Sequence, residues 1–121
     1  MVEKYSYDEE WKSLSYISSR LPTMNEVYET ETFSKLYLRL EKKEQDWIEK
    51  IKEQLMQNLG VGKPLGFLWF REKKFENKRL YFLINENARK SVLVAFATKR
   101  EQQRIINYIL YNKVEFLKLI A

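Results

Sequence analysis

The chain has 121 residues, of which 45% are hydrophobic and 32% charged, so it is long enough for one domain with a buried core. It contains no cysteine and no histidine, which excludes disulfides, cysteine-based zinc sites and catalytic sites built on either side chain. The charge is uneven: residues 1–62 hold 9 Lys/Arg and 12 Asp/Glu, whereas residues 63–121 hold 13 and 5, or 13 minus 5 = +8. This asymmetry predicts an anionic partner, either nucleic acid or an acidic protein segment. The alternative is a solvated Lys/Arg surface on a heat-adapted protein.

The N-terminal segment carries its own helical signal. Tyr7, Trp11 and Leu14 recur at helical spacing and Pro22 ends the pattern, which predicts a short amphipathic helix over residues 7–20. The first ten residues are acidic, and no apolar run approaches about 18 residues, so we expect neither a signal peptide nor a membrane span. Together with the absence of cysteine, this suits a cytoplasmic protein.

The next segments predict a strand, two helices and a turn. Residues 26–33 are rich in Thr, Val and aromatic residues, and their acidic side chains suit only an edge strand. Residues 34–58 carry an apolar stripe at helical spacing, which predicts two antiparallel helices that break near residues 41–43. Segment 60–66 holds all three glycines and one proline, so we expect a turn; it lacks the Gly-Lys-Ser/Thr of a phosphate-binding loop.

The second half predicts a sheet followed by a helix. Residues 67–75, 78–85 and 91–98 are rich in β-branched and aromatic residues and are joined by short turns, which indicates an antiparallel meander. The last of these runs is apolar on both faces, so it is expected to be central. Residues 101–120 show helical spacing of Ile, Leu and Val. The predicted fold class is α+β, with N-terminal helices packed on a small antiparallel sheet and a C-terminal helix.

Basic residues gather in the predicted sheet. Arg71 and Lys73 lie two apart on one strand and share a face, with Lys74 opposite. Arg79 begins the next strand and Arg100 follows the third. We therefore expect Arg71, Lys73, Arg79 and Arg100 to converge on one surface that binds phosphate. Further candidates for nucleic-acid binding are Lys63, Lys74, Lys78, Lys99 and Arg104.

Aromatic residues are interleaved with these cations. They could stack on bases, although aromatic residues in hydrophobic strands are more often part of the core. Acidic residues are scarce in this half of the chain, so we predict no metal site and no cofactor. The aromatic residues concerned are Phe67, Trp69, Phe70, Phe75, Tyr81 and Phe82.

This order of elements and motifs resembles the RelE/ParE superfamily of type II toxin–antitoxin toxins, as an archaeal-like member. The resemblance covers residues 27–121 and leaves residues 1–26 as a separate extension. Its most specific stretch is Val-Leu-Val-Ala-Phe-Ala-Thr-Lys-Arg-Glu-Gln-Gln over 92–103, because the family often ends its last core strand with a Lys-Arg-Glu sequence that enters a helix. The other stretches are Gly-Lys-Pro-Leu over 62–65 and Lys-Arg-Leu-Tyr-Phe-Leu over 78–83.

The resemblance implies a ribosome-dependent mRNA endoribonuclease (mRNA interferase) that needs no metal ion or cofactor. In that branch Arg71 and Lys73 match a pair of alternating basic residues, one of which is thought to act as a base. Arg79 matches an arginine that binds phosphate, and Arg100 matches one that stabilises the transition state. The ribose 2′-OH would attack the adjacent phosphate. Ile106 replaces the family's catalytic tyrosine, so the proton-handling residue is missing.

Other functions stay open. The missing tyrosine favours a non-enzymatic RelE/ParE-like protein that inhibits or regulates by binding a protein such as DNA gyrase, or nucleic acid. A scaffold that binds nucleic acid without toxicity is a third possibility. For a toxin, the resemblance implies a cognate antitoxin whose acidic segment covers the basic face. The extension over 1–26 is expected either to occupy that place or to form a homodimer through Trp11 and Leu14.

Overall fold

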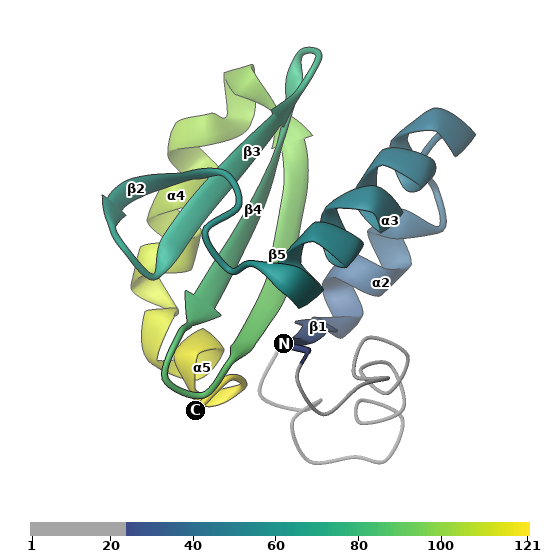
Figure 1. Cartoon of the computed structure of the whole chain (residues 1–121). Coiled ribbons are helices and arrows are strands. Elements are labelled where there is room, and N and C mark those ends of the chain that lie inside the picture. Colours follow the sequence, from purple (N-terminus) through teal and green to yellow (C-terminus); the bar gives the residue numbers. More distant parts are fainter. Residues whose placement is uncertain (1–23) are drawn as a thin grey trace.

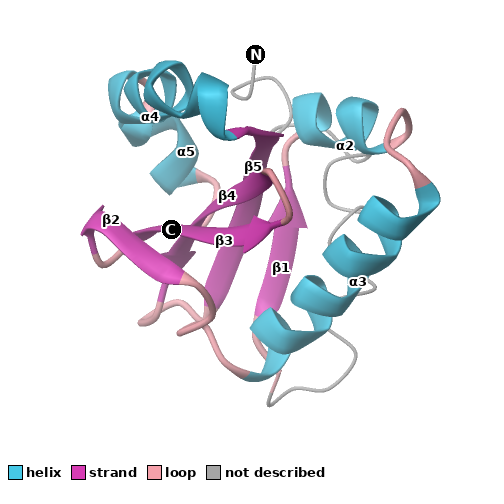
Figure 2. Cartoon of the chain, turned by 90° about the horizontal axis from the view of Figure 1, so that it is seen from above, coloured by secondary structure: helices cyan, strands magenta, loops and turns pink. Residues whose placement is uncertain are grey.

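The computed structural model describes residues 24–121, so the helix predicted over residues 7–20 lies outside it. The described chain forms a five-stranded sheet with helices on both of its faces (Figures 1 and 2). No helix in this part of the chain is long and apolar enough to cross a membrane. The elements in chain order are β1 (Glu26–Glu29), α2 (Glu31–Tyr37), α3 (Lys42–Gln57), β2 (Lys63–Phe67), β3 (Phe70–Phe75), β4 (Lys78–Asn85), β5 (Lys90–Thr98), the 3-10 helix η3 (Lys99–Glu101), α4 (Gln102–Tyr111) and α5 (Lys113–Lys118).

The strand order in the sheet is β1-β5-β4-β3-β2. The α+β class is confirmed, but the sheet is mixed rather than purely antiparallel, because β1 pairs with β5 in parallel. Strands β2 to β5 are joined by short turns, which enforce antiparallel pairing. No such turn joins β1 to β5, because two helices and three strands separate them in the sequence. The connection is therefore long enough for β1 to pair with β5 in parallel.

Helices α2 and α3 cover one face of the sheet. The Thr30 side chain accepts a hydrogen bond from the Phe33 N–H (3.0 Å) and caps α2, which ends the first strand before the predicted residue 33. The predicted break between the two helices is confirmed, and a reciprocal capping box between Glu41 and Glu44 starts α3. The apolar stripe of α3 packs on Leu80, Phe82, Leu93 and Phe96 of the sheet through Ile48, Ile51 and Leu55.

Helices α4 and α5 cover the opposite face. Ile105, Ile109 and Phe116 pack there against strand residues that include Phe70 and Tyr81. The single helix predicted over 101–120 is interrupted after Tyr111. There the Asn112 side chain donates a hydrogen bond to the Tyr108 carbonyl (2.9 Å) and so competes with the regular helix pattern.

The central position predicted for β5 is confirmed, since it lies between β1 and β4 with both faces buried. Regular alternation along this strand would place Val92, Val94 and Phe96 on one face, but Phe96 lies on the opposite face from the other two. A β-bulge interrupts the pairing where Tyr81 opposes Ala95 and Phe82 opposes Leu93. The extra residue, Val94, lies in the α4 core with Ala95, and Phe96 therefore faces α3.

Strand β2 was not predicted, because its sequence carries the signals of a turn. Gly62 and Gly66 have left-handed backbone (φ 75° and 82°), and Gly66 lies inside a bulged strand rather than in a turn. A Cβ atom on Gly62 would lie 2.3 Å from the carbonyl oxygen of Glu72 on β3. Only glycine allows β2 to approach β3 this closely.

Candidate functional site

Most of the candidate cations gather where β3 turns into β4 and where β5 ends. The Lys99 N–H donates to the Asn77 carbonyl in the β3–β4 turn (3.1 Å), which holds η3 beside that turn. Arg79 pairs with β3 on one side and with Ala97 of β5 on the other. We call this region the basic end and define it by Lys63, Lys73, Lys74, Arg79, Lys99 and Arg100.

The four residues expected to form one catalytic surface do not share a face. Arg71 and Lys73 pair with Phe82 and Leu80, whose side chains belong to the core under α3. Arg79 occupies the opposite face, where its neighbour Tyr81 packs under α4. The expected convergence is therefore wrong, because successive residues of a strand point to opposite faces and the pairing register fixes which face each one takes.

Arg71 is a structural residue in this fold. Its guanidinium donates hydrogen bonds to the carbonyls of Val61 (2.8 Å), Gly62 (3.0 Å) and Gly60 (3.2 Å), and a longer one to Leu68 (3.4 Å). The residue is only 9% exposed. These contacts hold the loop before β2 against the sheet, so the guanidinium is occupied by the protein's own backbone.

Arg79 has very different surroundings. Its Nε lies 3.6 Å from the buried carboxylate of Glu72, which also contacts Lys63 Nζ (3.8 Å) and the Gln102 side-chain amide (3.3 Å). Although the Arg79 side chain is only 12% exposed, it donates no hydrogen bond to any residue of the described chain. A guanidinium at the edge of a pocket whose N–H groups make no hydrogen bond within the described chain is suited to bind an anion such as phosphate.

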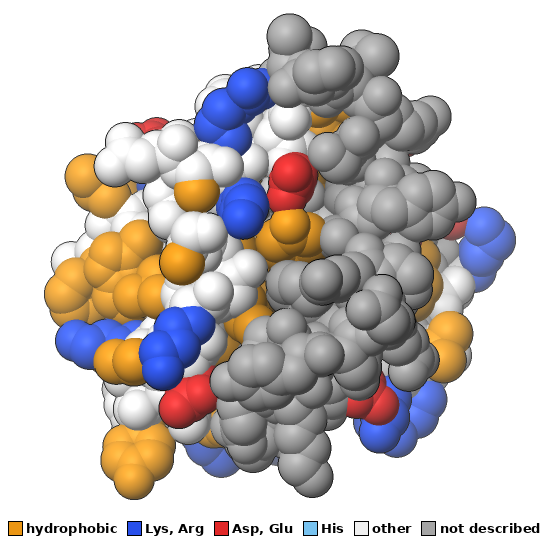
Figure 3. Space-filling model, turned by 90° about the horizontal axis from the view of Figure 1, so that it is seen from below, with side chains coloured by type: hydrophobic (Ala, Val, Ile, Leu, Met, Phe, Trp, Pro, Cys, Tyr) orange, Lys and Arg blue, Asp and Glu red, His pale blue; other side chains and the backbone are white. Residues whose placement is uncertain are grey.

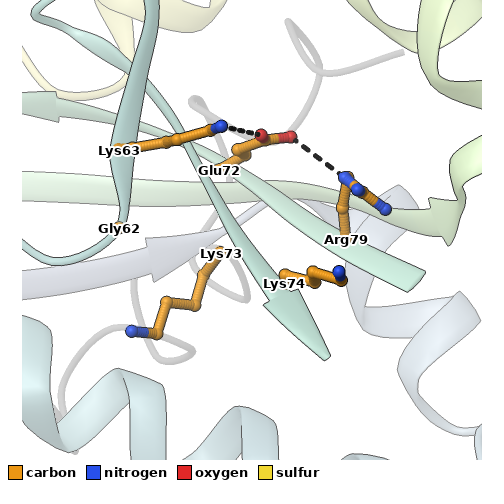
Figure 4. A pocket seen from close by; sticks show the side chains of 6 residues that line it. All are labelled: Gly62, Lys63, Glu72, Lys73, Lys74 and Arg79. Carbon is orange, nitrogen blue, oxygen red and sulfur yellow. Dashed lines mark ion pairs between the residues drawn. The ribbon is translucent and has the colours of Figure 1, made fainter. Parts of the chain in front are cut away.

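The pocket beside Arg79 has a volume of about 360 Å³ and wraps around the free edge of β3. Figure 4 shows Lys63, Glu72 and Arg79 in line on one side of that strand, with Lys73 directed to the other. The edge is free because β2 pairs with β3 no further than Glu72. Cations from both faces therefore border the same pocket, even though they do not form one flat surface.

Arg100 and Lys99 border a second pocket, of about 340 Å³, together with Asn77 and Thr98. Both cations are exposed. Within the described chain, neither of them lies within 4 Å of a carboxylate, and the same holds for Lys73 and Lys74. Four unpaired cations at one end of the sheet produce a positive potential that favours a polyanion.

Two further candidates are engaged elsewhere. Lys78 contacts the Glu44 carboxylate of α3 (2.7 Å) and lies over the Phe96 ring, and Arg104 pairs with Glu101 (3.0 Å). Burial alone would raise the pKa of Glu44, but the hydrogen bond from Lys78 and the Glu41 N–H outweigh burial and lower it. Lys78 is therefore mainly a structural cation that joins α3 to the sheet.

The hydroxyl of Tyr81 was not among the predicted site residues. It is fully buried and has no hydrogen-bond partner among residues 24–121, and burial together with the nearby Glu72 carboxylate raises the pKa of Tyr81 to about 12. The group is thus a phenol close to Arg79, but it is closed off from solvent. Ile106 of α4 is half-buried against the same core and places an apolar side chain there.

Sequence reasoning also missed Glu72 and Gln102. The one signal for Glu72 is its acidic charge within a basic strand, which suggests a partner for neighbouring cations. No pattern in the sequence links it to Gln102, because the contact between them joins β3 to α4 across 30 residues. Among residues 24–121, no group of three His, Cys, Asp or Glu residues lies close enough together to hold a metal ion.

Comparison of the chain with protein-family models, with curated proteins and with solved structures finds no match.

Proposed function

We propose that this protein is a toxin of a type II toxin–antitoxin pair, of the RelE/ParE kind, that acts on messenger RNA at the ribosome in the cytoplasm. The observation that carries the proposal is the basic end. It combines four cations that have no carboxylate partner in the described chain with Arg79, whose guanidinium donors are open. An RNA backbone offers the repeated phosphates that such a cluster binds.

The proposed chemistry is attack of a ribose 2′-oxygen on the adjacent phosphorus, which breaks the bond to the 5′-oxygen of the next nucleotide and leaves a 2′,3′-cyclic phosphate. Water accepts the proton of the 2′-OH and supplies the proton that the leaving 5′-oxygen takes up. Charge builds up on the phosphate oxygens during that attack, and cations placed at them stabilise the transition state. Arg79 and Arg100 are proposed to provide this stabilisation, while Lys73 and Lys74 position the strand. Arg71 is left out of the mechanism, because its donors hold the loop before β2.

A second candidate is a toxin or regulator that acts by binding a protein, such as DNA gyrase, without cutting RNA. Ile106 favours this alternative, since it places an apolar side chain in the core where the resembling nucleases carry a tyrosine. In either case a cognate antitoxin with an acidic segment would neutralise the basic end.

Controlled expression in a bacterial host separates these candidates. We expect the wild-type protein to arrest growth and to produce new mRNA ends at codons in the ribosomal A site. Arg79→Ala and Arg100→Ala should each reduce cleavage about 10²–10³-fold, the usual cost of losing one transition-state donor. Lys50→Ala removes an exposed cation of α3, distant in sequence from the basic end, and should leave cleavage unchanged.

Each protein would be purified and its thermal unfolding recorded, so that loss of activity is distinguished from loss of fold. Arrest without new mRNA ends would support the protein-binding candidate. Absence of arrest from a folded, expressed wild-type protein would contradict the toxin proposal altogether.

A further inference from the structure

The aromatic residues of the sheet differ sharply in exposure. Phe70, Tyr81 and Phe82 are fully buried, as expected of core residues. Phe67 at the end of β2 is 42% exposed, and Trp69 in the β2–β3 turn is half-buried. Phe75, next to the β3–β4 turn, is also half-buried, but its ring packs on Trp47 of α3 (centroids 4.9 Å apart). Phe67 and Trp69 lie together at the opposite end of β3.

These open rings continue a column that begins in the core. The Trp69 ring lies 5.9 Å from Phe70 at an interplanar angle of 21°, and the Phe67 ring lies 4.9 Å from Trp69 at 24°. Three nearly parallel rings thus run from the buried Phe70 outward to Phe67. A flat ring that ends such a column is suited to stack on another flat ring.

The column shares its face of the sheet with part of the basic end. Phe67 pairs with Phe70, and Lys63 pairs with Glu72, whose carboxylate contacts α4 through Gln102. Two residues further along the same face, Lys74 pairs with Arg79. From Phe70 to Lys74 the strand advances four residues, or about 13 Å, so one short RNA strand can reach both the rings and the cations.

The column borders a pocket of mixed polarity. Leu68 in the turn is 76% exposed, and with Trp69 and Leu117 of α5 it lines a pocket of about 460 Å³, whose lining also includes Arg71, Asn85, Glu86 and Asn87. In Figure 3, hydrophobic side chains gather on the side of the molecule where β2 and the C-terminal helices lie. Cations that lie about 13 Å along the same face from an exposed aromatic column favour a nucleobase attached to phosphates over an apolar peptide.

We propose that Phe67 and Trp69 form a stacking platform for an unpaired base of single-stranded RNA whose phosphates lie on Lys63, Lys74 and Arg79. The inference rests on the proposed function, since it assumes that the basic end binds RNA. It adds a second kind of contact, which depends on the presence of a base and tolerates different bases because each has a flat face.

The test measures binding of the full-length protein to two fluorescent oligonucleotides of equal length. One is single-stranded oligoadenylate with 2′-O-methyl groups, which block attack by the 2′-oxygen, and the other has the same backbone but abasic internal positions. Phe67→Ala is expected to weaken binding to the adenine strand about 5- to 150-fold and to leave binding to the abasic strand unchanged. Phe67→Tyr should retain affinity, and Leu68→Ala, which removes an exposed apolar neighbour, should have little effect.

A second variant, Lys74→Ala/Arg79→Ala, separates this inference from the proposed function. It should weaken binding to both oligonucleotides. If it does so while Phe67→Ala changes neither affinity, the stacking platform is refuted and RNA binding by the basic end stands. If wild-type protein binds neither strand, both proposals fail.

Discussion

Arg71 and Arg79 lie on neighbouring strands, yet their guanidinium groups have opposite surroundings. Arg71 is held by backbone carbonyls of the loop that precedes β2, whereas the Arg79 guanidinium forms an ion pair with Glu72 (3.6 Å) and donates no hydrogen bond to the described chain. Both are largely buried, so exposure alone does not distinguish them. The number of satisfied donors does distinguish them: those of Arg71 hold the fold together, and those of Arg79 are the basis of its proposed role in binding.

Replacement of Arg71 is expected to destabilise the fold. Arg71→Ala leaves the carbonyls of Gly60, Val61 and Gly62 without their side-chain donor, and the free energy of unfolding should fall by about 1–3 kcal/mol. Arg71→Lys should not restore stability, because one ammonium cannot reproduce the fork of the guanidinium. Urea denaturation measures both variants, with Lys73→Ala as the control expected within about 0.5 kcal/mol of wild type.

The pair between Glu44 and Lys78 predicts a pH-dependent contribution to stability. Because the pKa of Glu44 is lowered in the folded state, its ionised form stabilises the fold above the unfolded pKa of about 4.3, and this contribution is lost as the pH falls through the folded pKa. Lys78→Met should therefore lower the free energy of unfolding by about 1–3 kcal/mol at pH 7. Urea denaturation at pH 3 should show a much smaller difference, and an equal difference at both pH values would contradict this assignment.

At the scale of elements, hydrophobic spacing was enough to predict β4, β5, the α2–α3 hairpin and the helical C-terminus. It failed at β2, because two glycines and Pro64 indicate a turn when tertiary pairing is unknown. It also failed to predict the bulge at Val94, which exchanges the faces of the residues that follow. The candidate cations could be identified from charge, but their division between two faces and the binding of Arg71 to a distant loop depend on register and tertiary contact.

The two left-handed glycines provide a matched test of how β2 docks. Gly62→Ala should cost about 2–5 kcal/mol, from about 1–2 for left-handed backbone and about 1–3 for overlap with Glu72 and Phe82. Gly66→Ala meets open space, so only the backbone cost of about 1–2 kcal/mol is expected. Thermal unfolding of both variants checks the prediction, and equal losses would show that close packing of β2 on β3 is not what requires Gly62.

At the scale of the whole molecule, the fold places much of the excess positive charge of the chain in one region. The second half carries the excess of Lys and Arg, and its unpaired members at the β3–β4 turn and in η3 concentrate that charge at one end of the sheet. Cations elsewhere on the surface are more dispersed, and several pair with nearby acidic residues. Binding of a polyanion should therefore depend on where charges are removed, not only on how many.

The salt dependence of RNA binding tests this central claim most directly. One variant replaces Lys73, Lys74, Lys99 and Arg100 by alanine, and a control of equal charge replaces Lys50, Lys113, Lys118 and Arg39, which also have no acidic partner within the described chain. Each lost phosphate contact should reduce the slope of log affinity against log salt concentration by about 0.7 for single-stranded RNA. We predict a reduction of up to about 3 for the first variant and little change for the control; equal reductions in both would contradict a binding site at the basic end.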